Sequence, residues 1–195
     1  MDYDFFAFIS RMKYIDRWSL MRSTERENVQ EHSHMTAVLA HALGLIRREV
    51  FGRECRPEAL AAAALYHDAP EILTGDLPTP VKYHGALLHK AYDEVEGLAV
   101  EKLLSSLPEE LRPAYRELLE AHTREEDYLL VKAADRLSAY IKCVEERRAG
   151  NREFLSAERS TRQRLEEMAL PEVAWFLERF AGGFEKNLDE LGTLE

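Results

Sequence analysis

The chain has 195 residues, of which 46% are hydrophobic, and a formal net charge of −10. A domain of this length buries roughly 70% of its unfolded surface, so we expect one domain over residues 1–195. The acidic balance argues against a nucleic acid polymer as partner, because such binders neutralise phosphates with clustered lysine and arginine. A small phosphate ester remains compatible, since one metal ion and one or two basic residues can hold it.

The cysteines and the N-terminal segment indicate a cytoplasmic protein. Cys55 and Cys143 do not form the closely spaced framework of a secreted scaffold, which favours a reducing compartment. The start "MDYDFFAFIS" has no basic region before its apolar stretch. No apolar run approaches the roughly 18 residues needed to cross a bilayer, so we expect no membrane partner.

Helical periodicity recurs along the chain, whereas alternating strand patterns are hard to find, and this predicts an all-α helical bundle. The first helix is expected at about 3–14, followed by a loop over residues 15–27. Asn28 and Glu31 predict a capping box at the start of a helix that runs to about Val50. Pro57 suits the first turn of the next helix, which must bend or end near Pro70.

The second half of the chain is also expected to be helical. After the proline-rich loop "TGDLPTPVKYHG", the expected helices cover about 85–106, 108–122, 124–149, 152–168 and 171–191. Gly150-Asn151 is a stop signal. In the last helix an aromatic stripe predicts core or a subunit interface, and it consists of Phe176, Phe180, Phe184 and Leu188.

Four polar side chains stand among apolar neighbours. His32 lies on an apolar helix face, His67 and Asp68 end the alanine-rich helix, and Asp135 lies at the margin of an apolar arc. A buried carboxylate without a partner is costly, so each needs a cation or a hydrogen-bonding group. One shared divalent metal would satisfy all four, and two imidazoles with two carboxylates suit a first-row ion such as manganese, cobalt, iron or zinc.

Each of these residues also has a structural alternative. A single inward histidine such as His32 is more often a hydrogen-bonded core residue than a metal ligand. A single aspartate at a helix margin, such as Asp135, is more often part of a salt bridge. The adjacent pair His67-Asp68 favours the metal without deciding the question.

The ordered set His32, His67-Asp68 and Asp135 matches the H…HD…D pattern of the HD-domain metal-dependent phosphohydrolases. Within this superfamily, the chain is most similar to one family. The chain resembles the YfbR-like bacterial 5′-deoxynucleotidases over almost its full length, in the segments "RWSLMR", "ENVQEHS", "YHDAPEILTGDLPTPVKY", "VKAADRLSAYIKCVEE" and "AGNREF". Those enzymes remove phosphate from deoxyribonucleoside 5′-monophosphates.

The resemblance implies a set of site residues. It assigns one divalent metal per chain to His32, His67, Asp68 and Asp135, with cobalt or manganese favoured over iron, zinc or copper. It implies that Arg17 orients the phosphate, that Trp18 lines the sugar site, and that substrate also contacts His32, Asp68, Asp135 and the loop residues Asp76, Leu77, Pro78 and Thr79. It further implies a homodimer.

Glu71 matches the family's catalytic acid, with Arg17 and Asp76 as further catalytic residues. Glu71 follows Asp68 by three residues, so both project from one face if the helix continues past Pro70. Glu71 or Asp76 would manage protons, and the sequence does not assign which does which.

Three functions remain open on the sequence. The favoured one is hydrolysis of deoxyribonucleoside 5′-monophosphates. The second is an HD-type hydrolase of another nucleotide, such as a triphosphate or a signalling nucleotide. The third is a non-catalytic metal-binding protein, against which the presence of Glu71, Arg17 and Asp76 beside the four ligands argues.

Overall fold

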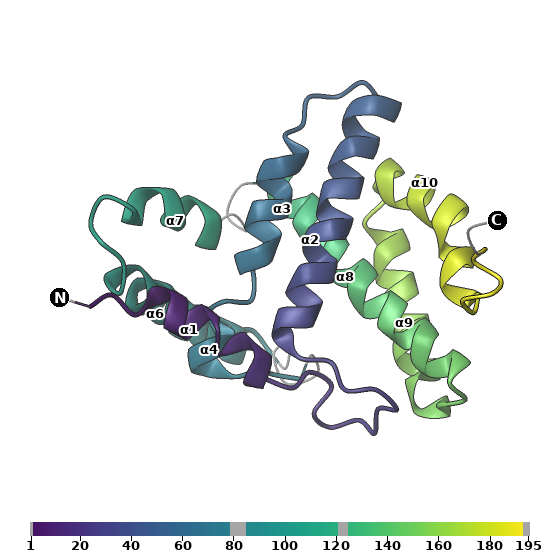
Figure 1. Ribbon diagram of the computed structural model, residues 1–195, viewed down its shortest axis with the longest axis horizontal. Helices are drawn as coiled ribbons and strands as arrows, with labels where there is room; N and C mark the ends of the chain where they lie inside the picture. Colours follow the sequence, from purple (N-terminus) through teal and green to yellow (C-terminus); the bar gives the residue numbers. More distant parts are fainter. Residues whose placement is uncertain (1, 79–84, 121–124, 193–195) are drawn as a thin grey trace.

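Three helices, α2, α3 and α8, meet at the centre of the computed structural model (Figure 1). The structure describes residues 2–78, 85–120 and 125–192. The helices in chain order are α1 (Phe5–Ile9), α2 (Val29–Leu45), α3 (Pro57–Tyr66), α4 (Glu71–Thr74), α6 (Ala86–Ser105), α7 (Arg112–Leu119), α8 (Glu125–Arg148), α9 (Leu155–Glu167) and α10 (Pro171–Phe180). Shorter turns are η1 (Met12–Tyr14), η2 (Ile46–Val50), η4 (Arg152–Phe154) and η5 (Ala181–Glu185).

The expected all-α fold is confirmed. The described residues contain no β-strand, and the one isolated bridge among them pairs Asp16 with Asn28. In Figure 1, α1, α4, α6 and α7 lie on one side of the central helices, and α9 and α10 lie on the other. No helix in the described part of the chain is both long enough and apolar enough to span a bilayer.

Local signals place the starts of the central helices. Asn28 Oδ1 accepts a hydrogen bond from the Glu31 amide at 3.0 Å, and Glu31 Oε2 accepts from the Asn28 amide at 3.1 Å, so the expected capping box is present. Pro57 opens α3 at its first position. Gly150, with φ of +86°, follows the end of α8, as the sequence predicts.

The first and last helices are shorter than expected. α1 stops at Ile9, and Ser10 Oγ donates to the carbonyl of Ala7 at 2.8 Å, an alternative to continued helical bonding. α10 stops at Phe180, because the following pair Gly182-Gly183 disfavours a helix by about 1 kcal/mol per residue.

The expected aromatic stripe is therefore broken. Phe176 belongs to the core, and Phe184 packs against the core from η5. Phe180 is 48% exposed and Leu188 is 77% exposed. The expected continuous helix over 171–191 was wrong, because α10 ends at Phe180. Phe176 and Phe184 contact the core as predicted, and a subunit interface at Phe180 and Leu188 stays a prediction.

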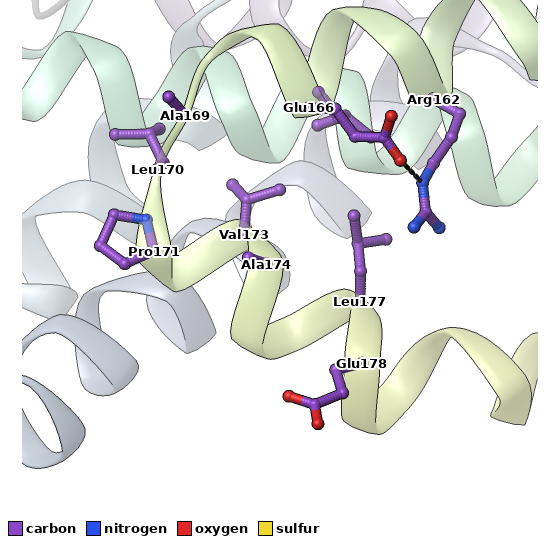
Figure 2. A pocket seen from close by; sticks show the side chains of 10 residues that line it. Arg162, Glu166, Ala169, Leu170, Pro171, Val173, Ala174, Leu177 and Glu178 are labelled. Atoms are coloured by element: carbon purple, nitrogen blue, oxygen red, sulfur yellow. Dashed lines mark hydrogen bonds and ion pairs between the residues drawn. The ribbon is translucent and has the colours of Figure 1, made fainter.

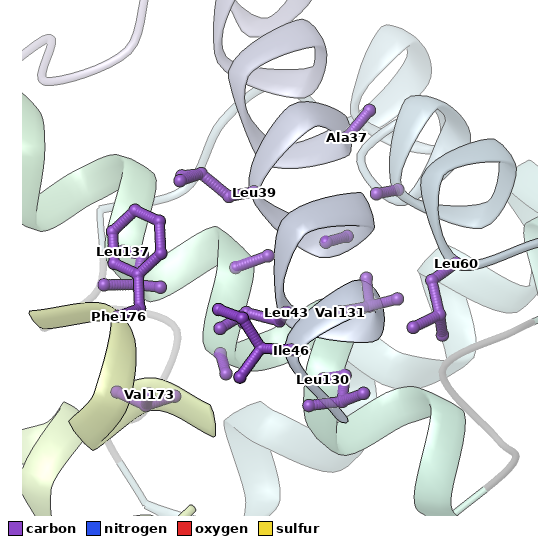
Figure 3. Packing of buried hydrophobic residues seen from close by; sticks show 14 of the residues in the cluster. Ala37, Leu39, Leu43, Ile46, Leu60, Leu130, Val131, Leu137, Val173 and Phe176 are labelled. Atoms are coloured by element: carbon purple, nitrogen blue, oxygen red, sulfur yellow. The ribbon is translucent and has the colours of Figure 1, made fainter. Parts of the chain in front are cut away.

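Buried hydrophobic residues in the described ranges form two clusters. The larger one, drawn in Figure 3, joins α2, α3 and α8 to α10 and includes Leu43, Leu60, Leu130, Leu137 and Phe176. Alanines in the same cluster allow these helices to approach closely. The second cluster joins α1, α6 and α7 to Ala69, which is fully buried one residue after Asp68. The segment that carries His67 and Asp68 is thus packed between both clusters.

The close contact of α2 with α3 depends on Gly44. A Cβ at this position would lie 2.9 Å from Pro57 Cα and 3.0 Å from Leu60 Cδ1. Gly97, in contrast, lies in α6 with nothing within 4 Å of an added Cβ.

We expect Gly44→Ala to destabilise the protein by about 1–3 kcal/mol, because overpacking outweighs the gain in helix propensity. Gly97→Ala is the matched control, and it should stabilise by about 0.5–1 kcal/mol. Urea unfolding followed by circular dichroism measures both. If Gly44→Ala is neutral or stabilising, α2 and α3 can move apart at little cost, and the close contact does not depend on Gly44.

Candidate metal and phosphate site

Three separate helical segments supply the four predicted metal ligands. His32 lies in the first turn of α2, directly after the capping box. Asp135 lies in α8 together with Ser138, three residues further along the same face. His67 is the C-cap of α3, and Asp68 follows it in the turn that leads to α4.

The structure brings these four side chains together. Ligand atoms of His32, His67 and Asp135 all lie within 4.8 Å of one another. His32 Nε2 is 3.1 Å from Asp135 Oδ1 and 3.5 Å from Asp68 Oδ2. His67 Nε2 is 3.1 Å from the same Asp68 oxygen. Two imidazole nitrogens and two carboxylates therefore converge on one small volume.

Hydrogen bonds on the opposite ring atoms orient both imidazoles. His67 Nδ1 donates to the carbonyl of Ala64 at 2.7 Å, so its Nε2 lone pair is free to bind a cation. His32 Nδ1 lies 3.1 Å from Ser138 Oγ, and donation to this hydroxyl leaves His32 Nε2 unprotonated toward Asp135. Both rings thus offer Nε2 on the side where the carboxylates lie.

His67 Nε2 tests whether these residues fit a metal. The atom is buried and, although it lies 3.1 Å from Asp68 Oδ2, it makes no hydrogen bond within the described part of the chain. A buried polar atom in this position needs a partner. A divalent cation shared with Asp68 satisfies it, so the donor set fits the group that the sequence predicts.

The charges of the site agree with this fit. Burial lowers the pKa of His32, and the nearby Arg17 lowers it further, which favours the neutral, ligating imidazole. Burial alone would lower the pKa of His67 as well, but Asp68 raises it to about 9, so a metal ion that binds Nε2 must displace a proton from it. The pKa values of Asp68 and Asp135 are lowered despite burial, mainly because each faces an imidazole. The carboxylates are ionised and attract positive charge.

Arg17 brings a guanidinium beside this cluster, and its side chain is only 13% exposed. Its Nη1 donates to Glu27 Oε2 at 2.7 Å. Burial alone would lower the pKa of Arg17. The net shift is upward, because four carboxylates act on the guanidinium: Glu27, Asp135, Asp68 and Asp76. Arg17 therefore lies within electrostatic reach of two of the predicted metal ligands, Asp68 and Asp135.

Trp18 is held beside Arg17 in an unusual conformation. Its φ is +58°, a left-handed value that is a true outlier for a bulky side chain. Trp18 Nε1 donates to Glu27 Oε2 at 2.9 Å, and its ring lies 5.2 Å from the ring of Phe154. Strained residues of this kind persist only where the surroundings fix them, and they cluster at functional sites.

The chain does not continue as an α-helix past His67. Residues 67–70 form a turn, α4 begins at Glu71, and the Glu71 amide donates to the Asp68 carbonyl at 3.0 Å. In such i→i−3 turns, side chains three apart eclipse each other. The break near Pro70 therefore leaves Glu71 on the same side of the turn as Asp68. Glu71 is buried.

The loop after α4 carries the other predicted substrate contacts. Asp76 lies near enough to Arg17 to raise its pKa. Leu77 and Pro78 are half-buried in the same segment. Thr79 lies outside the described residues.

The sequence analysis missed two residues that hold the site. Glu27 accepts hydrogen bonds from both Arg17 and Trp18. Its position at the start of the segment "ENVQEHS", which resembles the family, could have indicated it. Ser138 orients His32, and its signal was its spacing of three residues from Asp135. A further groove of about 620 Å³ lies between α9 and α10, and none of the predicted site residues lines it (Figure 2).

The helical fold and the clustered His32, His67, Asp68 and Asp135 are those of an HD-domain phosphohydrolase. The solved structure of an HD-domain phosphohydrolase from Listeria innocua matches with a TM-score of 0.77 and 27% identity, covering 97% of this chain and 92% of that one. The fold is also shared with a cyanophage S-2L HD phosphohydrolase bound to dA and one catalytic Zn²⁺, at a TM-score of 0.66 and 20% identity, over 91% of this chain and 96% of that one.

The chain belongs to the 5′-deoxynucleotidase YfbR-like family, whose model matches residues 4–184. It is 50% identical over 188 residues to a 5′-deoxynucleotidase of Vibrio parahaemolyticus, covering 96% of this chain and 97% of the relative. It is 47% identical to the 5′-deoxynucleotidase YfbR of Shigella flexneri, covering 96% and 94%.

We expect Asp68→Ala to weaken binding of Mn²⁺ by more than about 10²-fold, because it removes the carboxylate shared by both imidazoles. Calorimetric titration of the metal-free protein measures this. Asp93→Ala is the control, since Asp93 is exposed and pairs with His89 at 2.8 Å on α6. Equal Mn²⁺ affinity in the folded Asp68 variant and the wild type would remove Asp68 from the ligand set.

Proposed function

We propose that this protein hydrolyses deoxyribonucleoside 5′-monophosphates to deoxyribonucleoside and phosphate. The observation that carries the proposal is the largely buried guanidinium of Arg17 beside the four converging side chains. A purely structural metal site has no use for a largely buried cation next to it. Family membership agrees with this activity.

Arg17 is the phosphate-binding residue in this proposal. A guanidinium has five N–H donors in a planar fork, and Glu27 engages Nη1. The remaining donors can bind phosphoryl oxygens in a geometry that lysine does not offer. Glu27 thereby fixes the orientation of the group that orients the substrate.

Glu71 and Asp76 are the proton-handling residues. Glu71 is buried on the side of Asp68, and Asp76 acts on Arg17 from the following loop. One carboxyl group would accept a proton from the attacking water, and the other would give a proton to the leaving 5′-oxygen. The two roles are not assigned.

His32, His67, Asp68 and Asp135 would hold one divalent ion. When bound, the ion supplies positive charge that polarises a phosphoryl oxygen and acidifies water. Nitrogen and oxygen donors without cysteine suit several first-row ions, and we favour cobalt or manganese over iron, zinc and copper. The zinc of the cyanophage protein is a precedent for a metal in this fold.

We further propose a cytoplasmic homodimer that binds neither nucleic acid polymers nor membranes. The net charge of −10 supports a small-molecule substrate. The exposed Phe180 and Leu188 near the C-terminus are compatible with a subunit contact.

A phosphate-release screen tests the activity. The substrates are deoxy- and ribonucleoside mono-, di- and triphosphates, each with EDTA, Mn²⁺ or Co²⁺. Release from deoxyribonucleoside monophosphates that needs metal supports the proposal. Release from triphosphates alone, or from no nucleotide in any metal, would contradict it.

We expect Glu71→Gln to lower turnover by about 10²–10⁴-fold, because glutamine cannot transfer the proton. Mn²⁺ affinity should be kept, because glutamine has nearly the same size and shape as glutamate. Glu58→Gln is the control, since Glu58 is exposed at the start of α3. Steady-state kinetics and Mn²⁺ titration measure the two properties. If Glu71→Gln loses the metal instead, Glu71 belongs to the ligand set.

We expect Trp18→Ala to raise the ratio of kcat/KM for AMP over dAMP by about tenfold or more, because rejection of an added hydroxyl needs a steric block. Trp175→Ala is the control for the loss of an indole, since Trp175 stacks on Arg179 in α10. An unchanged ratio in Trp18→Ala, with the fold intact, would remove Trp18 from sugar discrimination.

A further inference from the structure

A buried carboxylate on α8 holds the loop that carries Arg17 and Trp18. Glu146 is 1% exposed, although it lies near the C-terminal end of α8. Its two oxygens accept hydrogen bonds from the Thr24 amide at 2.8 Å, Thr24 Oγ1 at 2.8 Å, the Glu25 amide at 3.2 Å, Lys142 Nζ at 2.7 Å and Asn151 Nδ2 at 2.8 Å. We call Glu146, Lys142 and Asn151 the Glu146 clamp.

The other members of the clamp also hold the 15–27 loop. Lys142 Nζ donates to the carbonyl of Glu25 at 2.6 Å, and Asn151 Nδ2 donates to the carbonyl of Arg22 at 2.7 Å. The Arg22 amide donates to Glu153 Oε1 at 3.2 Å. The loop is thus tied to α8 and η4 from residue 22 to residue 25.

These tethers continue to Trp18. The Met21 amide donates to the Trp18 carbonyl at 2.8 Å, so the turn that begins at Trp18 leads directly into the clamped segment. On its other side, the Arg17 amide donates to the carbonyl of Glu27 at 2.9 Å. Phe154, which follows Glu153, packs against the Trp18 ring. The left-handed Trp18 is therefore fixed from both ends of the loop.

The chemistry of the clamp indicates a role beyond stability. A buried ion pair is weak evidence for stability, because desolvation of both charges offsets their attraction. Such a pair can instead specify one conformation. Here all five partners of Glu146 are donors, so an ionised carboxylate satisfies them in one arrangement. Burial alone would raise the pKa of Glu146, but Lys142 and the other donors lower it to about 2.

We propose that Glu146 is a positioning residue for sugar discrimination, acting through the 15–27 loop on Trp18. This proposal rests on the proposed function of the site. Among the described residues, the Glu146 carboxylate makes no hydrogen bond to the predicted metal ligands or to Arg17; it fixes the backbone of the loop from which Trp18 projects. A misplacement of about 1 Å at a positioned group can cost about 10²-fold in rate.

The first test compares sugar selectivity in Glu146→Gln and wild type. A glutamine would point an NH₂ group at donors and leave the buried Lys142 ammonium without its counter-charge. We expect the ratio of kcat/KM for dAMP over AMP to fall by about tenfold. Thr24→Val is a milder second variant, which removes one hydrogen bond from the loop side, and we expect a fall of about twofold.

Glu172→Gln is the matched control. Glu172 is also fully buried and also bonds a cation, Arg47, at 2.7 Å, but it lies in α10. A fall of the ratio in Glu146→Gln with an unchanged ratio in Glu172→Gln supports the proposal. An equal fall in both would assign the effect to general destabilisation and overturn it. If Glu146→Gln does not fold, an unchanged ratio in Thr24→Val overturns it.

A second readout does not depend on activity. The chain has two tryptophans, so a Trp175→Phe background leaves Trp18 as the single tryptophan, and selective excitation of tryptophan avoids the eight tyrosines. We expect Glu146→Gln in this background to shift Trp18 emission to longer wavelength and to raise its quenching by acrylamide. Unchanged Trp18 fluorescence would overturn the proposal. If wild type releases no phosphate from dAMP, the proposed function fails, and the fluorescence still decides whether Glu146 positions Trp18.

Discussion

The confinement of two carboxylates beside two imidazoles is the constraint on which the rest of the molecule depends. Asp68 and Asp135, whose side chains are partly buried, are ionised next to the fully buried His32, and negative charge in such a place must be balanced. The balance requires α2, the end of α3 and α8 to meet closely, which the alanine-rich core between them permits. Under the proposed function, the same constraint would attract a divalent cation and, through it, a phosphate.

The two residues proposed to bind substrate, Arg17 and Trp18, lie on one loop, and hydrogen bonds restrict the conformation of that loop. Glu27 joins Arg17 and Trp18 through a single carboxylate oxygen. Glu146 ties the rest of the loop to α8 through buried hydrogen bonds. Because both tethers are carboxylates that face donors, the loop is held in one arrangement before any substrate binds. Preorganisation of this kind lowers the entropy that binding must otherwise remove.

Features with a local cause could be predicted from the sequence, whereas helix ends set by weaker effects could not. The capping box of Asn28, the start at Pro57 and the stop at Gly150 each follow from one residue's chemistry. The end of α1 depends on a side-chain bond of Ser10, and the end of α10 on two adjacent glycines. The prediction from hydrophobic periodicity alone made both helices too long.

Part of the candidate site could also be predicted from the sequence, because some of its residues differ in polarity from their neighbours. His32 and Asp135 stand out because polar residues among apolar neighbours need partners, and the structure brings them within 3.1 Å. Glu146 did not stand out, because its loop partner Thr24 lies 122 residues earlier and a glutamate on a helix is usually solvated. The most direct measurement of the central claim is anomalous diffraction at the manganese edge from crystals grown with Mn²⁺. The account predicts one peak surrounded by the side chains of His32, His67, Asp68 and Asp135; bound manganese at other residues, with no peak among these four, would contradict it.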